Sequence, residues 1–173
     1  KPVDVRPERP QMRQGGLELG RVLRVGRVPE RFERQAQNLA GLARDLRLFG
    51  FDTLFSGIMQ DTEIIYKALQ DKRTILTRDR EMLKNKQVTR GYWLRSQNPR
   101  EQLQEVIERL ALRSLVRPFT RCTVCNGILV RVPKSQVADM LKPLTRKNFD
   151  KFWQCPDCRR VYWKGSHYYN MMR

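Results

Sequence analysis

Four cysteines in two pairs constrain the fold of this chain more than any other feature. The pairs are Cys122-x-x-Cys125 and Cys155-x-x-Cys158, and the sequence contains no other cysteine. Two such turns converging on one ion supply the four thiolates of a tetrahedral Zn²⁺ site. Two disulfides or a redox motif are the alternatives, but disulfide scaffolds are usually smaller and richer in cysteine, and a redox motif needs only one pair. The spacing therefore predicts zinc.

A four-thiolate site locates a module in the chain but does not name an activity. Four protein ligands leave no open position for water, so we expect a structural ion. Metal binding would supply much of the folding free energy of a small zinc ribbon around residues 119–165. We assign residues 118–173 to this ribbon and to a C-terminal tail that is rich in basic and aromatic residues.

The charge of the chain predicts its kind of partner. The net charge is +17 over 173 residues, and the basic residues are spread along the whole length. Such a balance favours a polyanion, most commonly nucleic acid. No segment approaches the roughly 20 apolar residues of a membrane span. We also see no signal peptide in the charged, proline-rich N-terminus, and we expect a reducing, cytoplasmic location without a membrane partner.

The order of apolar segments predicts an α/β domain over residues 31–117. Helical spacing covers residues 36–49 and ends at Gly50, Asp61 is a candidate N-cap for a second helix, and Asn98 is one for a third. Short apolar runs at 51–55, 73–77 and 92–94 alternate with these helices. This alternation predicts a three-layer sandwich with a mainly parallel sheet. Residues 1–30 are expected to form an extended basic arm, with one candidate strand at 17–25.

Acidic residues follow the predicted strands. Asp79 lies where the run 73–77 ends, Asp61 and Glu63 start the preceding helix, and we expect Asp52 near the same edge. The carboxyl ends of parallel strands are where sites form in such sheets. Mg²⁺ or Mn²⁺ held there by carboxylates could position a phosphodiester and activate water. The alternative is that Asp61 and Asp79 are ordinary helix caps.

Several motifs, in order, resemble one known family. They are residues 42–55, Asp61-x-Glu63-Ile64, and then residues 73–80, 91–95, 99–103, 121–127, 152–158 and 161–167. Together they resemble the Mut-seven C-terminal RNase domain family, and most of all its free-standing bacterial members. In those members a small ubiquitin-like domain often precedes this one, and residues 3–7 look like the end of such a domain.

The resemblance implies a PIN-like nuclease fold followed by a zinc ribbon, acting on RNA. Carried over by position, Asp61 and Asp79 match the acidic residues of the family, with Glu63 and Glu81 as weaker companions. The implied activity is Mg²⁺- or Mn²⁺-dependent hydrolysis of RNA, with single-stranded or structured small RNA as the substrate.

One position departs from the family pattern. Family members usually carry an aspartate at the end of the first strand, and that position is Ala36 here. The preceding residues 32–35 are too polar for a buried central strand. Either Glu33 or another acid compensates, or the protein binds RNA without cutting it.

Basic and aromatic residues provide candidates for RNA contact. In the ribbon, Trp153, Tyr162 and Trp163 either stack on bases or form a small core, whereas the later tyrosines are expected to be exposed. The candidate contacts are Arg44, Arg47, Arg78, Arg160, Lys164, His167, Tyr168 and Tyr169. Three hypotheses follow: a metal-dependent ribonuclease, a non-catalytic RNA-binding module, and a basic adaptor in a protein or ribonucleoprotein complex.

Overall fold

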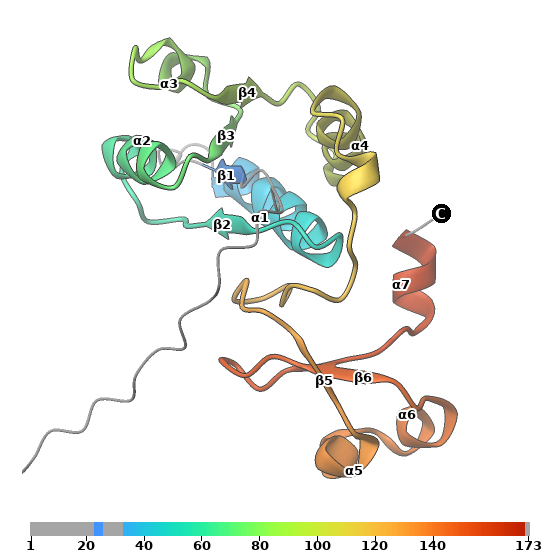
Figure 1. Ribbon diagram of the computed structural model, residues 1–173. Coiled ribbons are helices and arrows are strands. Elements are labelled where there is room, and N and C mark those ends of the chain that lie inside the picture. The colour runs from blue at the N-terminus through green and yellow to red at the C-terminus, as the bar shows by residue number, and fades with distance from the viewer. Residues whose placement is uncertain (1–22, 26–32, 172–173) are drawn as a thin grey trace, which may run out of the picture.

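The computed structural model describes residues 23–25 and 33–171, which form two sheets with helices around them (Figure 1). The first sheet has four strands in the order β2-β1-β3-β4, and the second has three in the order β5-β6-β7. We call residues 23–116 the four-stranded part and residues 119–171 the cysteine part. No helix in the described residues is long and apolar enough to cross a membrane.

All strands of the first sheet run parallel. They are β1 (Leu23–Val25), β2 (Thr53–Phe55), β3 (Thr74–Thr77) and β4 (Gly91–Trp93). The central strand is β1, which pairs with β2 on one side and with β3 on the other. The parallel sheet is therefore confirmed. The strand expected at 17–25 is confirmed for residues 23–25, and residues 17–22 lie outside the described residues.

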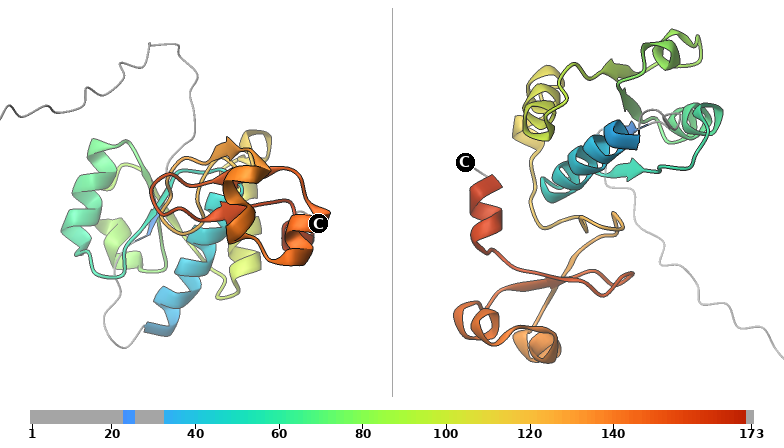
Figure 2. Two further views of the ribbon diagram at one scale, coloured as in Figure 1. Left: turned by 90° about the horizontal axis from the view of Figure 1, so that it is seen from below. Right: turned by 180° about the vertical axis from the view of Figure 1, so that it is seen from behind.

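Helices cover both faces of this sheet: α1 (Glu33–Leu48) and α4 (Pro99–Arg109) pack together, while α2 (Asp61–Gln70) lies across the strands from them (Figure 2). Neighbouring residues of β3 show why. Ile75 packs in one apolar cluster with Ile64 and Ile65 of α2, whereas Leu76 packs in another with Leu42 of α1 and Val106 of α4. Successive side chains of a strand point to opposite faces. The mixed α/β class is confirmed.

The first strand does not lie where the resemblance to the family placed it. Ala36, the position expected to end that strand, lies inside α1, which begins at Glu33. The strand that occupies the centre of the sheet is instead β1, eleven positions earlier at Val25. The placement of Ala36 at a strand end is wrong, because the surrounding Gln, Ala, Leu and Arg residues favour a helix. The segment that joins β1 to α1 lies outside the described residues.

Gly50 ends the first helix as predicted. Its φ of 93° is a backbone conformation that glycine adopts without strain. A Cβ at this position would also collide with the carbonyl oxygen of Arg117. The Arg117 N–H donates to the carbonyl of Phe49 at 2.8 Å. Gly50 thus lets the chain that leaves the four-stranded part pass directly against the end of α1.

The cysteine part contains a small antiparallel sheet and short helices. Its strands are β5 (Val130–Val132), β6 (Phe152–Gln154) and β7 (Val161–Tyr162). The helices are α5 (Lys134–Val137), α6 (Pro143–Asn148) and α7 (Ser166–Met171). Two short 3₁₀ turns lie at Arg113–Leu115 and Ala138–Met140, and α3 (Arg80–Lys84) follows β3 in the first part. The cysteines lie on the turns that precede β5 and follow β6 (Figure 1).

Candidate metal centre and sheet-edge site

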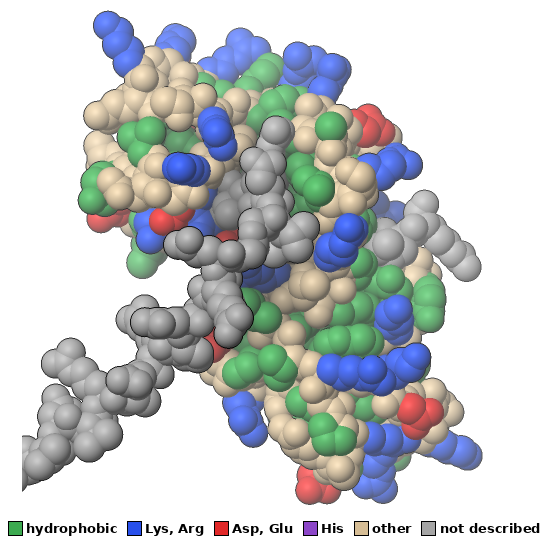
Figure 3. All heavy atoms as spheres, in the orientation of Figure 1, with side chains coloured by type: hydrophobic (Ala, Val, Ile, Leu, Met, Phe, Trp, Pro, Cys, Tyr) green, Lys and Arg blue, Asp and Glu red, His purple; other side chains and the backbone are tan. Residues whose placement is uncertain are grey.

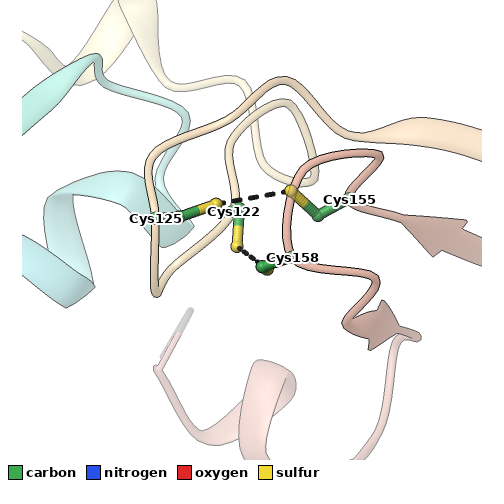
Figure 4. Close-up of side chains that lie close together, drawn as sticks. All are labelled: Cys122, Cys125, Cys155 and Cys158. Carbon is green, nitrogen blue, oxygen red and sulfur yellow. Dashed lines mark hydrogen bonds between the residues drawn. The ribbon is translucent and has the colours of Figure 1, made fainter.

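The four cysteine sulfurs converge on one point (Figure 4). All four Sγ atoms lie within 4.8 Å of one another, with 3.5 Å between Cys122 and Cys158 and 3.4 Å between Cys125 and Cys155. None of the four forms a disulfide. Four sulfurs at about 2.3 Å from a tetrahedral ion would lie about 3.8 Å apart. The arrangement fits a closed tetrathiolate metal site and supports zinc binding.

The two turns that carry these sulfurs share one backbone design. In the first, the Asn126 N–H donates to the Cys122 carbonyl at 3.0 Å, and in the second the Arg159 N–H donates to the Cys155 carbonyl at 2.9 Å. Asn126 and Arg159 both have positive φ, 69° and 63°. We call these turns the first and second knuckles. Asparagine tolerates this conformation better than arginine does, so the first knuckle is the less strained of the two.

Hydrogen bonds make one of the thiols easy to ionise. Burial disfavours the thiolate of Cys122, but donors from the Cys125 N–H, the Tyr162 hydroxyl and the Val124 N–H outweigh it and lower the pKa of Cys122 to about 6. Burial, followed by contact with sulfurs such as that of Cys155, raises the pKa of Cys125 to about 12. Thiolates crowded in this way repel one another, and a divalent cation is the group that stabilises several of them together.

The first knuckle is bound directly to the four-stranded part through Asn126. Its side-chain oxygen accepts from the backbone N–H of Thr53 at 3.0 Å, and its amide nitrogen donates to Asp52 Oδ1 at 2.6 Å. The Asp52 carboxylate also faces Arg73 at 3.4 Å and Arg121 at 3.5 Å. Asp52 thus joins cations of both parts, and the side chain of Asn126 serves as a partner for the outer edge of β2.

Arg47 completes this junction from the end of α1. Its Nε donates to the carbonyl of Thr53 at 2.8 Å, and its Nη1 donates to the carbonyls of Thr123 at 3.2 Å and Val124 at 2.8 Å. The residue is only 8% exposed, and burial lowers the pKa of the guanidinium. Because these carbonyls occupy the guanidinium inside the protein, we do not include Arg47 in the proposed RNA surface.

The junction corrects the expected position of Asp52. Asp52 directly precedes β2 and Arg73 directly precedes β3, so both lie at the amino edge of the parallel sheet. The expectation that Asp52 shares the carboxyl edge with Asp61 and Asp79 is wrong. The reason is that β2 begins only at Thr53, so that this residue enters the strand instead of leaving it.

The predicted catalytic acids begin the helices that follow β2 and β3. Asp61 is the first residue of α2, and the N-cap is Gln60, one position earlier than expected. Glu63 accepts from the Gln60 N–H at 2.9 Å. Asp79 caps α3 by accepting from the Glu81 N–H at 2.8 Å, as in the helix-cap interpretation.

These acids do not form a cluster of metal ligands in the described residues. The only group there with three or more clustered Cys, His, Asp or Glu ligands is the set of four cysteines. Glu81 forms an exposed ion pair with Lys84 at 2.7 Å. Because β1 lies between β2 and β3, the carboxyl ends of β2 and β3 are separated by about 10 Å, which is two strand spacings. The segments that lead to Asp61 and Asp79 start from these two strand ends.

Cationic groups surround Trp93 at the same edge. The Arg80 guanidinium lies 3.8 Å from the centroid of the Trp93 ring, and Arg95 lies 6.0 Å from it. The Trp93 Nε1–H donates to the Arg78 carbonyl at 3.3 Å. The Nε and Nη1 atoms of Arg78 are buried, and no group in the described residues accepts a hydrogen bond from them. Buried donors are normally satisfied, so Arg78 is the group at this edge most in need of an acceptor.

The remaining RNA candidates lie in the cysteine part. Arg160 and Lys164 are exposed, Tyr169 is 55% exposed, and Tyr168 is half-buried. His167 lies in α7, and its side chain is outside the described structure. Lys and Arg side chains are spread over both parts on the face seen in Figure 3.

Sequence reasoning missed the junction between the parts. Asn126 was noted only as part of the motif 121–127, and Arg47 only as a candidate RNA contact. The available signal in the sequence was an asparagine directly after Cys125, because asparagine adopts the positive φ of this position more readily than most residues do. That signal does not reveal the partner, because Thr53 is far away in the sequence.

One of three comparisons with known proteins shows the family. No curated protein and no solved structure matches the chain. A family model, described as the Mut7-C RNAse domain, matches residues 31–173, which include the whole cysteine part and all of the four-stranded part after β1. The resemblance seen in the motifs is thereby confirmed, and this chain belongs to the Mut7-C RNAse domain family.

Proposed function

We propose that this protein binds RNA and hydrolyses its phosphodiester bonds with the help of Mg²⁺ or Mn²⁺. The observation that carries the proposal is the family match over residues 31–173. In this proposal residues 31–117, together with the strand β1, form a PIN-like domain, residues 118–173 form a zinc ribbon, and the rest of residues 1–30 is a basic arm or the remnant of another domain. In the same proposal, RNA is the partner of the protein and the cytoplasm is its location.

Arg78 supports an anionic ligand at the carboxyl edge. The buried Nε and Nη1 atoms of Arg78 lie where β3 ends, next to the cap of α3, and no group in the described residues accepts a hydrogen bond from them. A phosphate oxygen is the acceptor that best suits a guanidinium. The cations Arg80 and Arg95 around Trp93 add positive charge at the same edge. We therefore place the RNA backbone across the ends of β3 and β4.

The acids at this edge are the proposed metal ligands. Asp61 and Asp79 follow two parallel strands that flank β1, and Glu63 and Glu81 lie within the first turns of the same helices. Hard divalent cations take carboxylate oxygens and water. A bound Mg²⁺ or Mn²⁺ would orient the phosphodiester and activate a water for in-line attack. The zinc site has no open position and serves the fold.

A second candidate is an RNA-binding protein without nuclease activity. The absence of a cluster of three or more metal-ligating side chains around Asp61 and Asp79 in the described residues favours it, since a divalent cation is usually held by several ligands. The capping bonds of Asp79 and Glu63 also give these residues a structural reason to be present.

The test is cleavage of a labelled single-stranded RNA by zinc-loaded protein, with and without added Mg²⁺ or Mn²⁺. Omitting the added metal is a better control than a strong chelator, which would also strip the cysteine site. The variant is Asp79→Asn, because asparagine caps a helix as well as aspartate does but is a poor ligand for a hard cation. Asp139→Asn is the matched control, since Asp139 is exposed in the cysteine part.

For the nuclease, we expect metal-dependent cutting that Asp79→Asn reduces at least about a hundredfold, of the order of the loss of a major catalytic interaction. RNA binding and the Asp139→Asn variant should be unchanged. Binding without cutting under either metal would establish the second candidate. If naked RNA is bound only weakly, with little salt dependence, the basic adaptor would replace both candidates.

A further inference from the structure

A pocket of about 480 Å³ lies where the end of α1 meets the cysteine part. Residues far apart in the sequence line it, among them Arg44, Asp45, Phe119, Tyr162, Trp163 and Tyr168. Its volume is within the range of about 300–1,000 Å³ that is typical of small-ligand sites. The pocket is distinct from the carboxyl edge, because the end of α1 lies at the amino edge of the parallel sheet.

Aromatic rings form one wall of this pocket. Phe119 stacks on Trp153 with ring centroids 4.5 Å apart, and the Tyr168 ring is tilted against Phe119 with centroids 5.0 Å apart. Phe119 is 7% exposed and fixed, whereas Tyr168 is half-buried and keeps part of its ring accessible. A ring that neighbouring rings hold in place loses little conformational entropy when a ligand stacks on it.

Cations lie beside the aromatic wall. The Lys164 ammonium lies 5.7 Å from the Tyr168 ring and 6.0 Å from the Phe119 ring. Arg44 keeps 63% of its side chain exposed and lies 3.6 Å from the carboxylate of Asp45, which is itself 12% exposed. The pocket therefore offers aromatic faces, positive charge at its rim and one carboxylate.

We propose that this pocket holds one unpaired base of a single-stranded RNA, with Tyr168 as the stacking residue and Arg44 and Lys164 on the flanking phosphates. The proposal rests on the RNA-binding function given above. Aromatic stacking is open to every base because each has a π-face. The charges favour a nucleotide over a purely apolar peptide, because such a peptide would leave these cations unmatched.

The pocket adds a length requirement to RNA recognition. Along α1, the distance from Glu33 to Arg44 is roughly 16 Å at 1.5 Å per residue. Stacked nucleotides of one strand advance about 3.4 Å each. A strand that reaches from the carboxyl edge to the pocket therefore spans about five nucleotides. The pocket then anchors the RNA at a distance from the acids.

The test is the affinity of zinc-loaded protein for a labelled single-stranded RNA of about ten nucleotides, measured by fluorescence anisotropy. Tyr168→Leu removes the stacking ring but stays apolar, and Tyr66→Leu is the matched control on an exposed tyrosine of α2 that does not line the pocket. We expect Tyr168→Leu to weaken binding about five- to a hundredfold, the usual value of one stacked base. Tyr66→Leu should change it less than about twofold.

A second pair of variants tests the rim without touching the core. Arg44→Gln should reduce the slope of log affinity against log salt by about one, whereas Arg113→Gln, an exposed arginine outside the pocket lining, should not. Affinity for a duplex RNA should be indifferent to Tyr168→Leu, because paired bases cannot enter the pocket. Zinc content and near-UV circular dichroism verify that each variant is folded.

The outcomes separate this proposal from the general function. If single-stranded RNA binds but Tyr168→Leu and Tyr66→Leu behave alike, the base pocket is refuted while RNA binding stands. If neither RNA form binds, both proposals fail. Sedimentation of the free protein addresses the competing occupant, since a dimer that Tyr168→Leu dissociates would assign the pocket to a second copy of the chain and overturn the base site.

Discussion

The two parts of this molecule are stabilised by different means. The four-stranded part buries large aliphatic side chains in two clusters on the faces of its sheet, with Leu42, Leu46, Ile64 and Leu76 fully buried. The cysteine part has only small clusters, and one of them consists of Leu129 with buried sulfurs. Apolar burial is worth about 1.5–3 kcal/mol for a large side chain. The first part is thus stabilised by packing, and we expect the second to depend on a metal ion at its four cysteines.

The comparison shows that the junction has an unequal effect on the two parts. Asn126 belongs to the first knuckle, so its position is defined by the metal, but the groups that it bonds belong to the four-stranded part. Loss of metal should therefore disorganise the cysteine part and remove hydrogen-bond partners from the amino edge of the sheet. Loss of packing in the four-stranded part should leave the metal site intact until the whole chain unfolds.

Removal of the metal should have the largest effect. We expect a strong chelator, or the variant Cys155→Ser, to abolish hydrogen-exchange protection in residues 119–171 while residues 39–110 keep most of theirs. Structural zinc in small domains contributes about 10–16 kcal/mol of apparent binding free energy. The measurement is hydrogen exchange by mass spectrometry together with zinc content. Full protection of the cysteine part in Cys155→Ser would contradict the dependence on metal.

Leu42→Ala should have the next largest effect, and on the other part. Leu42 has 0% exposure in the cluster between α1 and the sheet, and a cavity there costs about 2–5 kcal/mol. Urea unfolding gives the change in free energy, and zinc content before unfolding should stay the same. Leu144→Ala is the control, because Leu144 is 73% exposed and should change stability by less than about 0.5 kcal/mol. A drop in zinc content in folded Leu42→Ala would show that the two parts are not separable.

A pair of glycine variants measures the junction itself. Asn126→Gly keeps the positive φ of the first knuckle but removes the bonds to Thr53 and Asp52. We expect it to lower the free energy of unfolding by about 1–3 kcal/mol, since a buried hydrogen-bonded group is lost. Arg159→Gly changes the matching position of the second knuckle, which has no such bonds among the described contacts, and should be neutral or slightly stabilising. Equal effects of the two variants would mean that the knuckle turn, and not the docking, is what matters.

The smallest effect concerns a partly buried ion pair near the amino edge. A hydrogen bond from Arg73, at 2.7 Å, lowers the pKa of Asp71 from its ordinary value. A carboxyl group whose pKa is lower in the folded protein stabilises it above the unfolded pKa of about 3.9, and this contribution is lost as the pH falls through the folded pKa. Asp71→Asn should cost less than about 1 kcal/mol near neutral pH and nothing in strong acid. Urea midpoints at several pH values measure it, and a constant difference at all pH values would exclude the ion pair as its cause.

Local signals allowed much of the fold to be predicted. Gly50 as the stop of α1, Asn98 as the cap of α4 and the four cysteines as one cluster all follow from short sequence patterns, and each is confirmed. Such features depend on a few neighbouring residues or on a spacing that one metal imposes. The family was equally accessible, because its motifs are dense from residue 42 onwards.

The errors came from features that depend on distant partners. The strand β1 lies between β2 and β3, but a strand this short has only weak periodicity in its sequence. The resemblance to the family therefore led us to expect the end of the first strand at Ala36, which lies in α1. The edge at which Asp52 lies depends on where β2 begins, which is two residues later than the start of the expected run. The pocket joins Arg44 to Tyr168 only because the two parts dock, and no local pattern records that docking.

The position of the first knuckle has one more consequence, for solubility. β2 is an edge strand, and an exposed strand edge is a template for pairing with other chains. Here the Thr53 N–H and carbonyl are taken by Asn126 and Arg47, which is itself held by the knuckle carbonyls. A metal ion that holds the first knuckle in place would therefore also shield an edge that could otherwise pair with strands of other chains. Cells short of zinc should accumulate this protein as aggregates before they degrade it as an unfolded chain.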